Sequence, residues 1–116
     1  MLHLLKIAGE VANLSTDRMR KSFMGGVAIR RDGTLVYSRN GSTICRYPEK
    51  TPSIHVEHRL LRKAGFGSTV YVSRVKRDGS YGMAKPCPRC MAGLKARGVE
   101  MVYYTISATD WEACKP

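Results

Sequence analysis

The chain has 116 residues, enough for one domain with a single modest core and too few for two domains. Hydrophobic residues make up 43% and charged residues 25%, which is ordinary for a globular protein, and no apolar run approaches the roughly 20 residues that cross a bilayer. The 20 lysines and arginines against 9 acidic residues leave a net charge of +11, which favours an anionic partner, although a solvated cationic surface would explain it too.

The spacing of apolar residues predicts an alternation of helices and strands. Apolar residues at three- and four-residue steps indicate amphipathic helices, and β-branched and aromatic runs indicate strands. Asp32-Gly33 lies between two such runs and is a strong hairpin signal. In chain order the expected elements are a helix from Leu4 to about Met19, strands at 26–30 and 35–38, a helix from about Ile54 to Ala64, a strand at 69–73, a helix from Pro88 to Gly98 and a strand at 101–106.

Glycine and proline mark the connections between these elements. Residues 40–53 contain Gly41, Pro48 and Pro52 and indicate a loop, and residues 76–80 indicate a turn. The tail from Ser107 carries no clear pattern. The α-β-β-α-β-α-β order predicts a single α/β domain over residues 1–116, with a mixed central sheet flanked by helices.

Two short motifs carry the chemistry of the chain. His55 and Glu57 form H-x-E at the start of the second expected helix, and Pro86, Cys87 and Cys90 form P-C-x-x-C at the start of the third. Imidazole nitrogen and thiolate sulfur are ligands that Zn²⁺ prefers, and three protein ligands leave the fourth tetrahedral position to water. A carboxylate beside such a water can carry protons, so the set is typical of hydrolytic catalysis with Glu57 as the proton carrier.

A structural zinc site is the alternative interpretation. It would need a fourth protein ligand, for which His58, Cys45 and Cys114 are the candidates. The chain would then be a zinc-stapled nucleic-acid-binding module without catalysis, which its net charge would suit. Such a site gains nothing from Glu57, and the catalytic interpretation is therefore favoured, with Cys45 and Cys114 as ordinary thiols.

The N-terminus and the cysteines indicate the compartment. Lys6 and Glu10 interrupt the first apolar stretch, which argues against a signal peptide, and two of the 4 cysteines belong to the C-x-x-C. We therefore expect a reducing, cytoplasmic compartment.

With these motifs and this order of elements, the chain resembles the cytidine/deoxycytidylate deaminase superfamily, the zinc-dependent nucleobase deaminases, over nearly its whole length. H-x-E followed by P-C-x-x-C is the signature of these enzymes. Val56 within H-x-E, where alanine is common, and the following His58 depart from the pattern and would reshape a pocket. The other matching stretches are Gly25-Gly26-Val27-Ala28-Ile29 with Asp32-Gly33, Asn40-Gly41, and the run from Gly98 to Tyr104.

The resemblance implies a role for each matching residue. His55, Cys87 and Cys90 would bind zinc, and Glu57 would carry protons while hydroxide attacks C4 of a cytosine and ammonia leaves. Asn40 would bind the sugar hydroxyl, although Asn-Gly pairs are also common in turns. Members of the superfamily commonly assemble so that a neighbour closes the pocket, and we expect a homo-oligomer here.

The loop that follows Asn40 suggests the substrate. Ser42 and Arg46, with the hydroxyls between them, supply donors suited to phosphate oxygens. We expect deamination of a free cytosine nucleotide or nucleoside, with dCMP to dUMP ahead of the others. A base deaminase acting on single-stranded DNA or RNA is the alternative. The scattered basic residues would suit the phosphate backbone of a nucleic acid. The aromatic residues, 1 Trp, 2 Phe and 6 Tyr, offer no evident long platform on which bases could stack.

Overall fold

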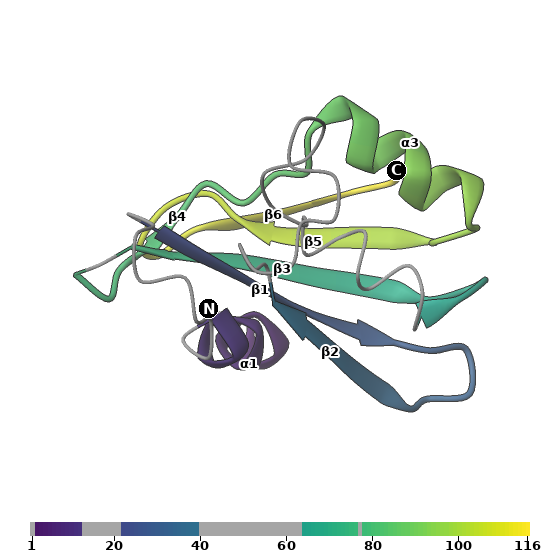
Figure 1. The fold of residues 1–116 in the computed structure, drawn as a ribbon, viewed down its shortest axis with the longest axis horizontal. Helices are drawn as coiled ribbons and strands as arrows, with labels where there is room; N and C mark the ends of the chain where they lie inside the picture. Colours follow the sequence, from purple (N-terminus) through teal and green to yellow (C-terminus); the bar gives the residue numbers. More distant parts are fainter. Residues whose placement is uncertain (1, 13–21, 40–63, 77) are drawn as a thin grey trace, which may run out of the picture.

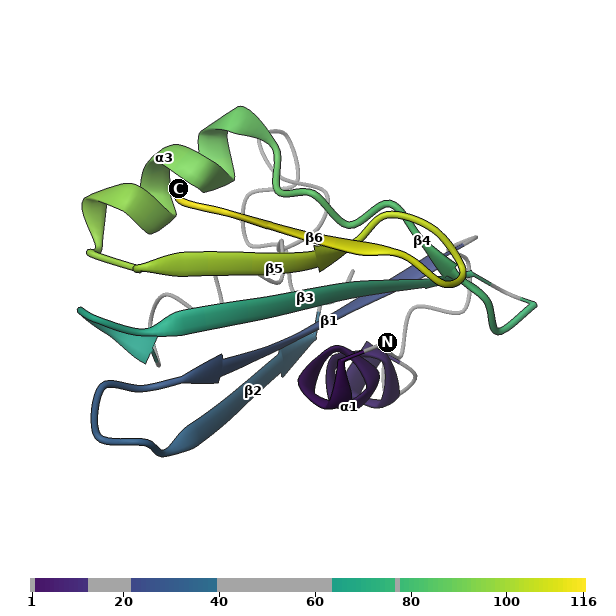
Figure 2. The same ribbon diagram turned by 180° about the vertical axis from the view of Figure 1, so that it is seen from behind.

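The structure is a computed structural model that describes residues 2–12, 22–39, 64–76 and 78–116. A mixed sheet of six strands runs through these residues, with α1 on one face and α3 on the other (Figures 1 and 2). The strand order is β2-β1-β3-β5-β6, and β4 pairs with the last part of β3. This arrangement confirms the predicted α/β class with a mixed central sheet; of the predicted second helix, only Ala64 lies among the described residues.

The described elements follow the predicted order and add two strands to it. β3 and β5 are parallel, and the other pairs are antiparallel. The elements are α1 (His3–Ala12), β1 (Ser22–Ile29), β2 (Leu35–Arg39), β3 (Thr69–Lys76), β4 (Tyr81–Gly82), α3 (Pro88–Ala96), β5 (Met101–Thr105) and β6 (Trp111–Cys114).

The hairpin between β1 and β2 forms where Asp32-Gly33 predicted it. Gly33 has a φ of 90°, which a residue without a Cβ adopts at little cost. The Arg30 amide donates to the Thr34 carbonyl at 2.8 Å, which closes the turn. Hydrogen bonds from the Thr34 hydroxyl and amide lower the pKa of Asp32, so its side chain is held as a carboxylate in this turn.

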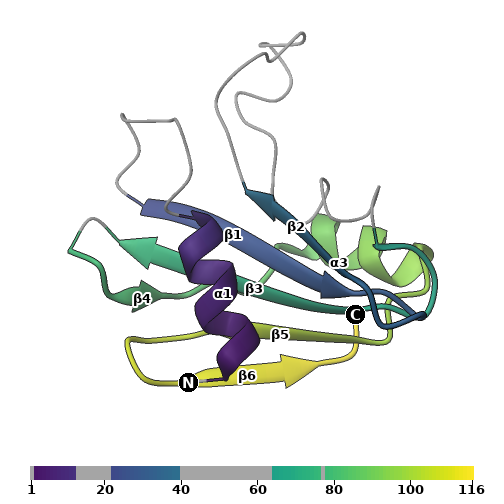
Figure 3. The ribbon, with the colours of Figure 1, turned by 90° about the horizontal axis from the view of Figure 1, so that it is seen from below.

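The helix α1 lies unusually close to the sheet at one glycine. A Cβ at Gly25 of β1 would lie 2.0 Å from the Ala8 carbonyl oxygen and 2.4 Å from the Ala12 amide nitrogen. Leu5, Ala8 and Ala12 are fully buried against this face. Small residues at the contact therefore allow α1 to cross the sheet as Figure 3 shows, and the predicted helix is confirmed over His3–Ala12, its continuation to Met19 lying outside the described residues.

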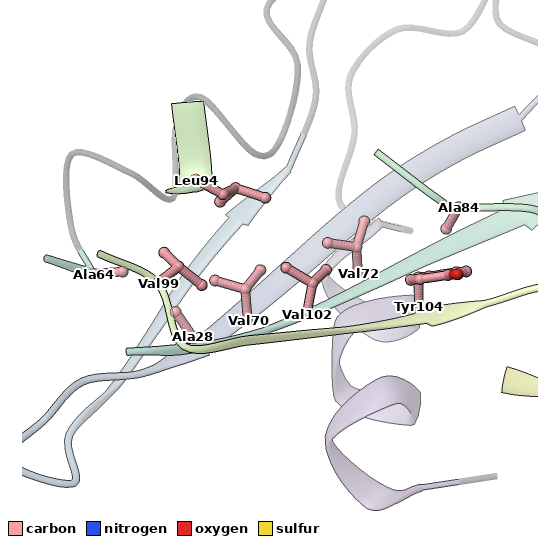
Figure 4. Close-up of a cluster of buried hydrophobic side chains, with 9 residues drawn as sticks. All are labelled: Ala28, Ala64, Val70, Val72, Ala84, Leu94, Val99, Val102 and Tyr104. Atoms are coloured by element: carbon pink, nitrogen blue, oxygen red, sulfur yellow. The ribbon is translucent and has the colours of Figure 1, made fainter. Parts of the chain in front are cut away.

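The main hydrophobic core lies on the opposite face, between the sheet and α3 (Figure 4). Leu94 of α3 packs over Val70 and Val102, which are neighbours on the parallel strands β3 and β5. The cluster extends along the strands to Ala84 and Tyr104. Side chains of alternate residues of β3 and β5 thus supply the floor beneath α3.

Two strands were missing from the sequence prediction. β4 forms because the turn at Asp78-Gly79 brings Gly82 opposite Arg74, and β6 forms because a turn after Thr105 brings Glu112 opposite Tyr104. β3 also continues beyond its predicted end at Ser73, because Arg74 and Lys76 pair with β1. In the described part of the chain, no helix has the length and apolarity needed to cross a membrane.

Candidate functional site

The helix α3 begins at the predicted cysteine motif. Cys87 is the N-cap residue with extended backbone angles (φ −66°, ψ 162°), and its carbonyl accepts the Met91 amide at 2.9 Å. Pro88 occupies the first helical position, where the missing N–H removes no helical hydrogen bond. Gly98, with a φ of 79°, follows the helix, and the Val99 amide donates to the Leu94 carbonyl at 3.1 Å. The helix predicted from Pro88 to Gly98 is thereby confirmed.

The helical start determines the surroundings of both motif thiols. Cys90 lies three residues after Cys87, so the two side chains belong to one helical turn. Cys90 is buried, with 1% of its surface exposed, whereas Cys87 is exposed at the end of the helix. The partial positive charge at a helix N-terminus favours the thiolate form, which is the form that binds metals.

Cys87 and Cys90 match a zinc site in the chemistry and spacing of their donors. Soft sulfur ligands in a C-x-x-C at a helix start are typical of zinc-binding turns. No group of three candidate metal ligands occurs among the residues that the structure describes, and the third predicted ligand, His55, lies outside them. The residues present therefore fit part of a zinc site, and the complete ligand set stays a prediction.

Most of the other predicted site residues also lie outside the described ranges. Glu57, which is expected to carry protons, is one of them, as are Asn40, Ser42 and Arg46, which are expected to bind substrate. The structure thus describes two of the predicted site residues, Cys87 and Cys90, and brings them together at the start of α3.

From the sequence, no role was assigned to one residue of the α3 face of the sheet, Arg74. Arg74 lies in β3 on the same face as Val70 and Val72, because side chains alternate along a strand. Its Nη2 donates to the Met24 sulfur at 3.7 Å, and its Nε is buried without a hydrogen-bond partner in the described structure. The alternation of two basic residues with Val75 could have indicated such a placement.

Three aromatic residues of the sheet gather on the other face. Tyr71 and Tyr103 stack with ring centroids 4.7 Å apart, and Trp111 lies 5.8 Å from Tyr103 in a tilted arrangement. Alternation along β3 places Tyr71 on the face of Ser73, whose hydroxyl bonds to α1. This aromatic group therefore lies on the side of the sheet away from the cysteines of α3.

Comparison with known proteins identifies the architecture. No family model and no curated protein sequence matches the chain. Among solved structures, cytidine deaminase from Burkholderia pseudomallei superposes with a TM-score of 0.72 at 15% identity, covering 99% of this chain and 93% of that one.

Two mycobacterial structures agree with this result. Cytidine deaminase from Mycobacterium leprae superposes with a TM-score of 0.61 at 18% identity, covering 95% of this chain and 89% of that one. For the enzyme from Mycobacterium tuberculosis the TM-score is 0.59 at 21% identity, with 87% and 80% covered. The likeness extends over nearly the whole chain and confirms the resemblance at the level of the fold. The chain has the fold of the cytidine deaminases.

Proposed function

We propose that the chain is a zinc-dependent hydrolytic deaminase that converts cytosine to uracil in a free nucleotide or nucleoside, with dCMP to dUMP as the first candidate reaction. The observation that carries this proposal is the position of Cys87 and Cys90 in the first turn of α3, on the core face of a sheet with the cytidine deaminase fold. A zinc-binding turn at this place, together with H-x-E in the same chain, is the sequence signature of a nucleobase deaminase.

Each motif residue has a task in this reaction. Cys87 and Cys90 would hold zinc as thiolates, and His55 would complete the protein ligands. When bound, zinc supplies a Lewis acid that makes water acidic enough to be deprotonated near neutral pH. Glu57 takes the proton of the attacking water and delivers it to the ring nitrogen of cytosine. The hydroxide left by this transfer bonds to C4, and Glu57 carries the remaining proton of that hydroxyl to the amino group, so that the C4–N bond breaks, a C4 carbonyl remains and ammonia leaves.

The position of the cysteines supports this division of tasks. A helix N-terminus stabilises negative charge, so it favours the thiolate form, which is the form that binds metal. Cys90 is buried at the edge of the core and Cys87 is exposed. One of the two proposed ligands is thus held by packing, while the other is open to solvent.

The test is deamination of matched cytosine compounds. We would measure kcat/KM for dCMP, deoxycytidine, CMP and a single-stranded oligonucleotide at one salt concentration, following ammonia release. We expect dCMP to be turned over best. Glu57→Gln should keep zinc but lose turnover by several orders of magnitude, because it cannot accept a proton.

The outcome separates the proposal from its alternatives. Turnover of the oligonucleotide alone would assign the reaction to single-stranded nucleic acid, which the net charge of +11 would suit. If zinc-loaded protein turns over none of these compounds, the alternative of a non-catalytic zinc module is favoured. Undiminished activity of Glu57→Gln would remove that residue from the mechanism.

Assembly and location complete the proposal. A domain of 116 residues buries a limited share of its surface, and we propose a homo-oligomer that works in the cytoplasm. Light scattering on the zinc-loaded protein should give a multiple of 12.9 kDa. A mass of one chain at micromolar concentration would contradict the oligomer.

A further inference from the structure

Among the residues that the structure describes, no carboxylate forms an ion pair with the guanidinium of Arg74. Its Nε is buried without a partner among them, and Nη2 donates only to the Met24 sulfur, a weak acceptor. Buried charges in proteins are usually paired, because removing an ion from water without a counter-charge is costly. Arg74 is half-buried, so that part of this cost applies to it and an anion can still reach the guanidinium.

Arg74 lies on the face of the sheet that α3 covers. It is near the end of β3, and the N-terminus of α3 points toward that end (Figure 1). Thr105 joins the two regions: its hydroxyl donates to the Gly82 carbonyl at 2.7 Å and accepts the Arg74 amide at 3.2 Å. The Ala84 amide then donates to the Thr105 carbonyl at 2.8 Å, which holds the chain shortly before Cys87.

A second cation lies beside Arg74. A Cβ at Gly82 would lie 3.0 Å from Cε of Lys76 and 3.4 Å from Cδ of Arg74, so both stems cross the same glycine of β4. Asp78 is the acidic group of this hairpin whose pKa Lys76 affects, but its pKa is lowered first by hydrogen bonds from Ser80. Two like charges thus lie over one glycine, and in the described hairpin Asp78 is the neighbour of Lys76.

We propose that Arg74, with Lys76 beside it, binds a phosphate of the substrate, so that the site selects phosphorylated cytosine over the free nucleoside. This inference rests on the proposed deaminase function. A guanidinium offers paired donors that match phosphate oxygens, and an ammonium adds charge without directional demand. The phosphate comes either from a free nucleotide or from a nucleic acid strand, and the experiment below distinguishes these sources.

The experiment compares phosphorylated and unphosphorylated substrates in matched variants. Arg74→Met keeps the stem over Gly82 and removes the charge, Arg74→Lys keeps the charge, and Lys95→Met removes an exposed charge from the last turn of α3 as the control. The measurements are kcat/KM for dCMP, deoxycytidine and a single-stranded oligonucleotide, with zinc content and melting temperature for each variant.

For Arg74→Met we expect kcat/KM for dCMP to fall about 10- to 100-fold while that for deoxycytidine changes less than about threefold. Arg74→Lys should recover part of the loss, and Lys95→Met should match the wild type. The melting temperature of Arg74→Met should equal or exceed that of the wild type, because a half-buried charge with no ion pair among the described residues is removed. A fall in kcat/KM for the oligonucleotide alone would still support the anion site, and it would show that the bound phosphate belongs to a nucleic acid.

Equal falls for dCMP and deoxycytidine, or no fall for either, would overturn the inference and leave the deaminase function standing. If the wild type deaminates none of these compounds, the proposed function fails. The anion site is then tested separately, by the binding of phosphate compounds to the wild type and to Arg74→Met. Inorganic phosphate and dUMP should then raise the melting temperature of the wild type more than that of Arg74→Met. Equal shifts in the two proteins would overturn the anion site.

Discussion

The Ser73 hydroxyl donates a hydrogen bond of 2.6 Å to the Leu5 carbonyl oxygen, in a contact buried between β3 and α1. It joins residues 68 positions apart in the chain, where the helix crosses the sheet (Figure 3). Ser73 itself is fully buried, and the hydroxyl is satisfied by the helix backbone. The contact therefore anchors α1 by a polar interaction within an otherwise apolar layer.

Ser73→Ala should lower the free energy of unfolding by about 1 kcal/mol, because one buried hydrogen bond to the helix backbone is lost. Urea denaturation followed by circular dichroism measures the change. Thr109→Ala, which removes a hydroxyl from an exposed position, is the control and should change stability by less than about 0.5 kcal/mol. Equal stability of Ser73→Ala and the wild type would show that the contact contributes nothing.

Gly25→Ala should destabilise the protein by about 3 kcal/mol or more. The new methyl group would meet backbone atoms of Ala8 and Ala12, which cannot rotate away as a side chain would. Gly33→Ala is the comparison: its Cβ would meet nothing within 4 Å, so only the strain of a φ of 90° remains, about 1 to 2 kcal/mol. Thermal unfolding of both variants tests the order, and a smaller loss for Gly25→Ala would contradict the close packing of α1.

Zinc should be retained through Cys87 and Cys90 and not through Cys114. Cys87→Ser and Cys90→Ser should each lose bound zinc and melt at a lower temperature, because metal binding is coupled to folding. Cys114→Ser alters a half-buried thiol in β6 and should keep one zinc per chain. Elemental analysis of protein purified without added metal measures the zinc content per chain. A full zinc content in Cys90→Ser would exclude Cys90 as a ligand.

Stability should decline in alkaline solution because of Tyr104. Burial first, and then its hydrogen bond to Glu112, raise the pKa of Tyr104 to about 12, compared with an ordinary value near 10. Between these two pH values the unfolded chain loses the phenol proton while the folded chain keeps it. The stabilisation is therefore present below about pH 10 and is lost as the pH rises toward about 12.

Tyr104→Phe should reduce the loss of stability between about pH 10 and pH 12, because the variant has no phenol proton to lose at this position. Urea midpoints measured from pH 8 to pH 12 provide the comparison. Parallel profiles of the two proteins would show that Tyr104 does not control the alkaline decline.

The elements that the sequence predicted correctly are those determined within a few neighbouring residues. Asp32-Gly33 specifies its hairpin because the turn needs a positive φ, and Gly33 has one. The start of α3 follows from Pro88, and its end follows from Gly98. The first turn of that helix also brings Cys87 and Cys90 together, and so this part of the candidate site was predictable from spacing alone.

Tertiary pairing decided what the sequence pattern did not show. β4 has two residues and no periodicity of its own, and it exists because Gly82 lies opposite Arg74. β6 likewise forms by pairing with β5, where the Tyr104 hydroxyl meets Glu112. The surroundings of the Arg74 guanidinium, whose Nε has no hydrogen-bond partner among the described residues, are also a tertiary property, because sequence alone does not tell which distant groups it will meet. Local turn and helix chemistry thus determined the secondary structure, whereas contacts between distant strands decided the sheet edges and the surroundings of the charged residue.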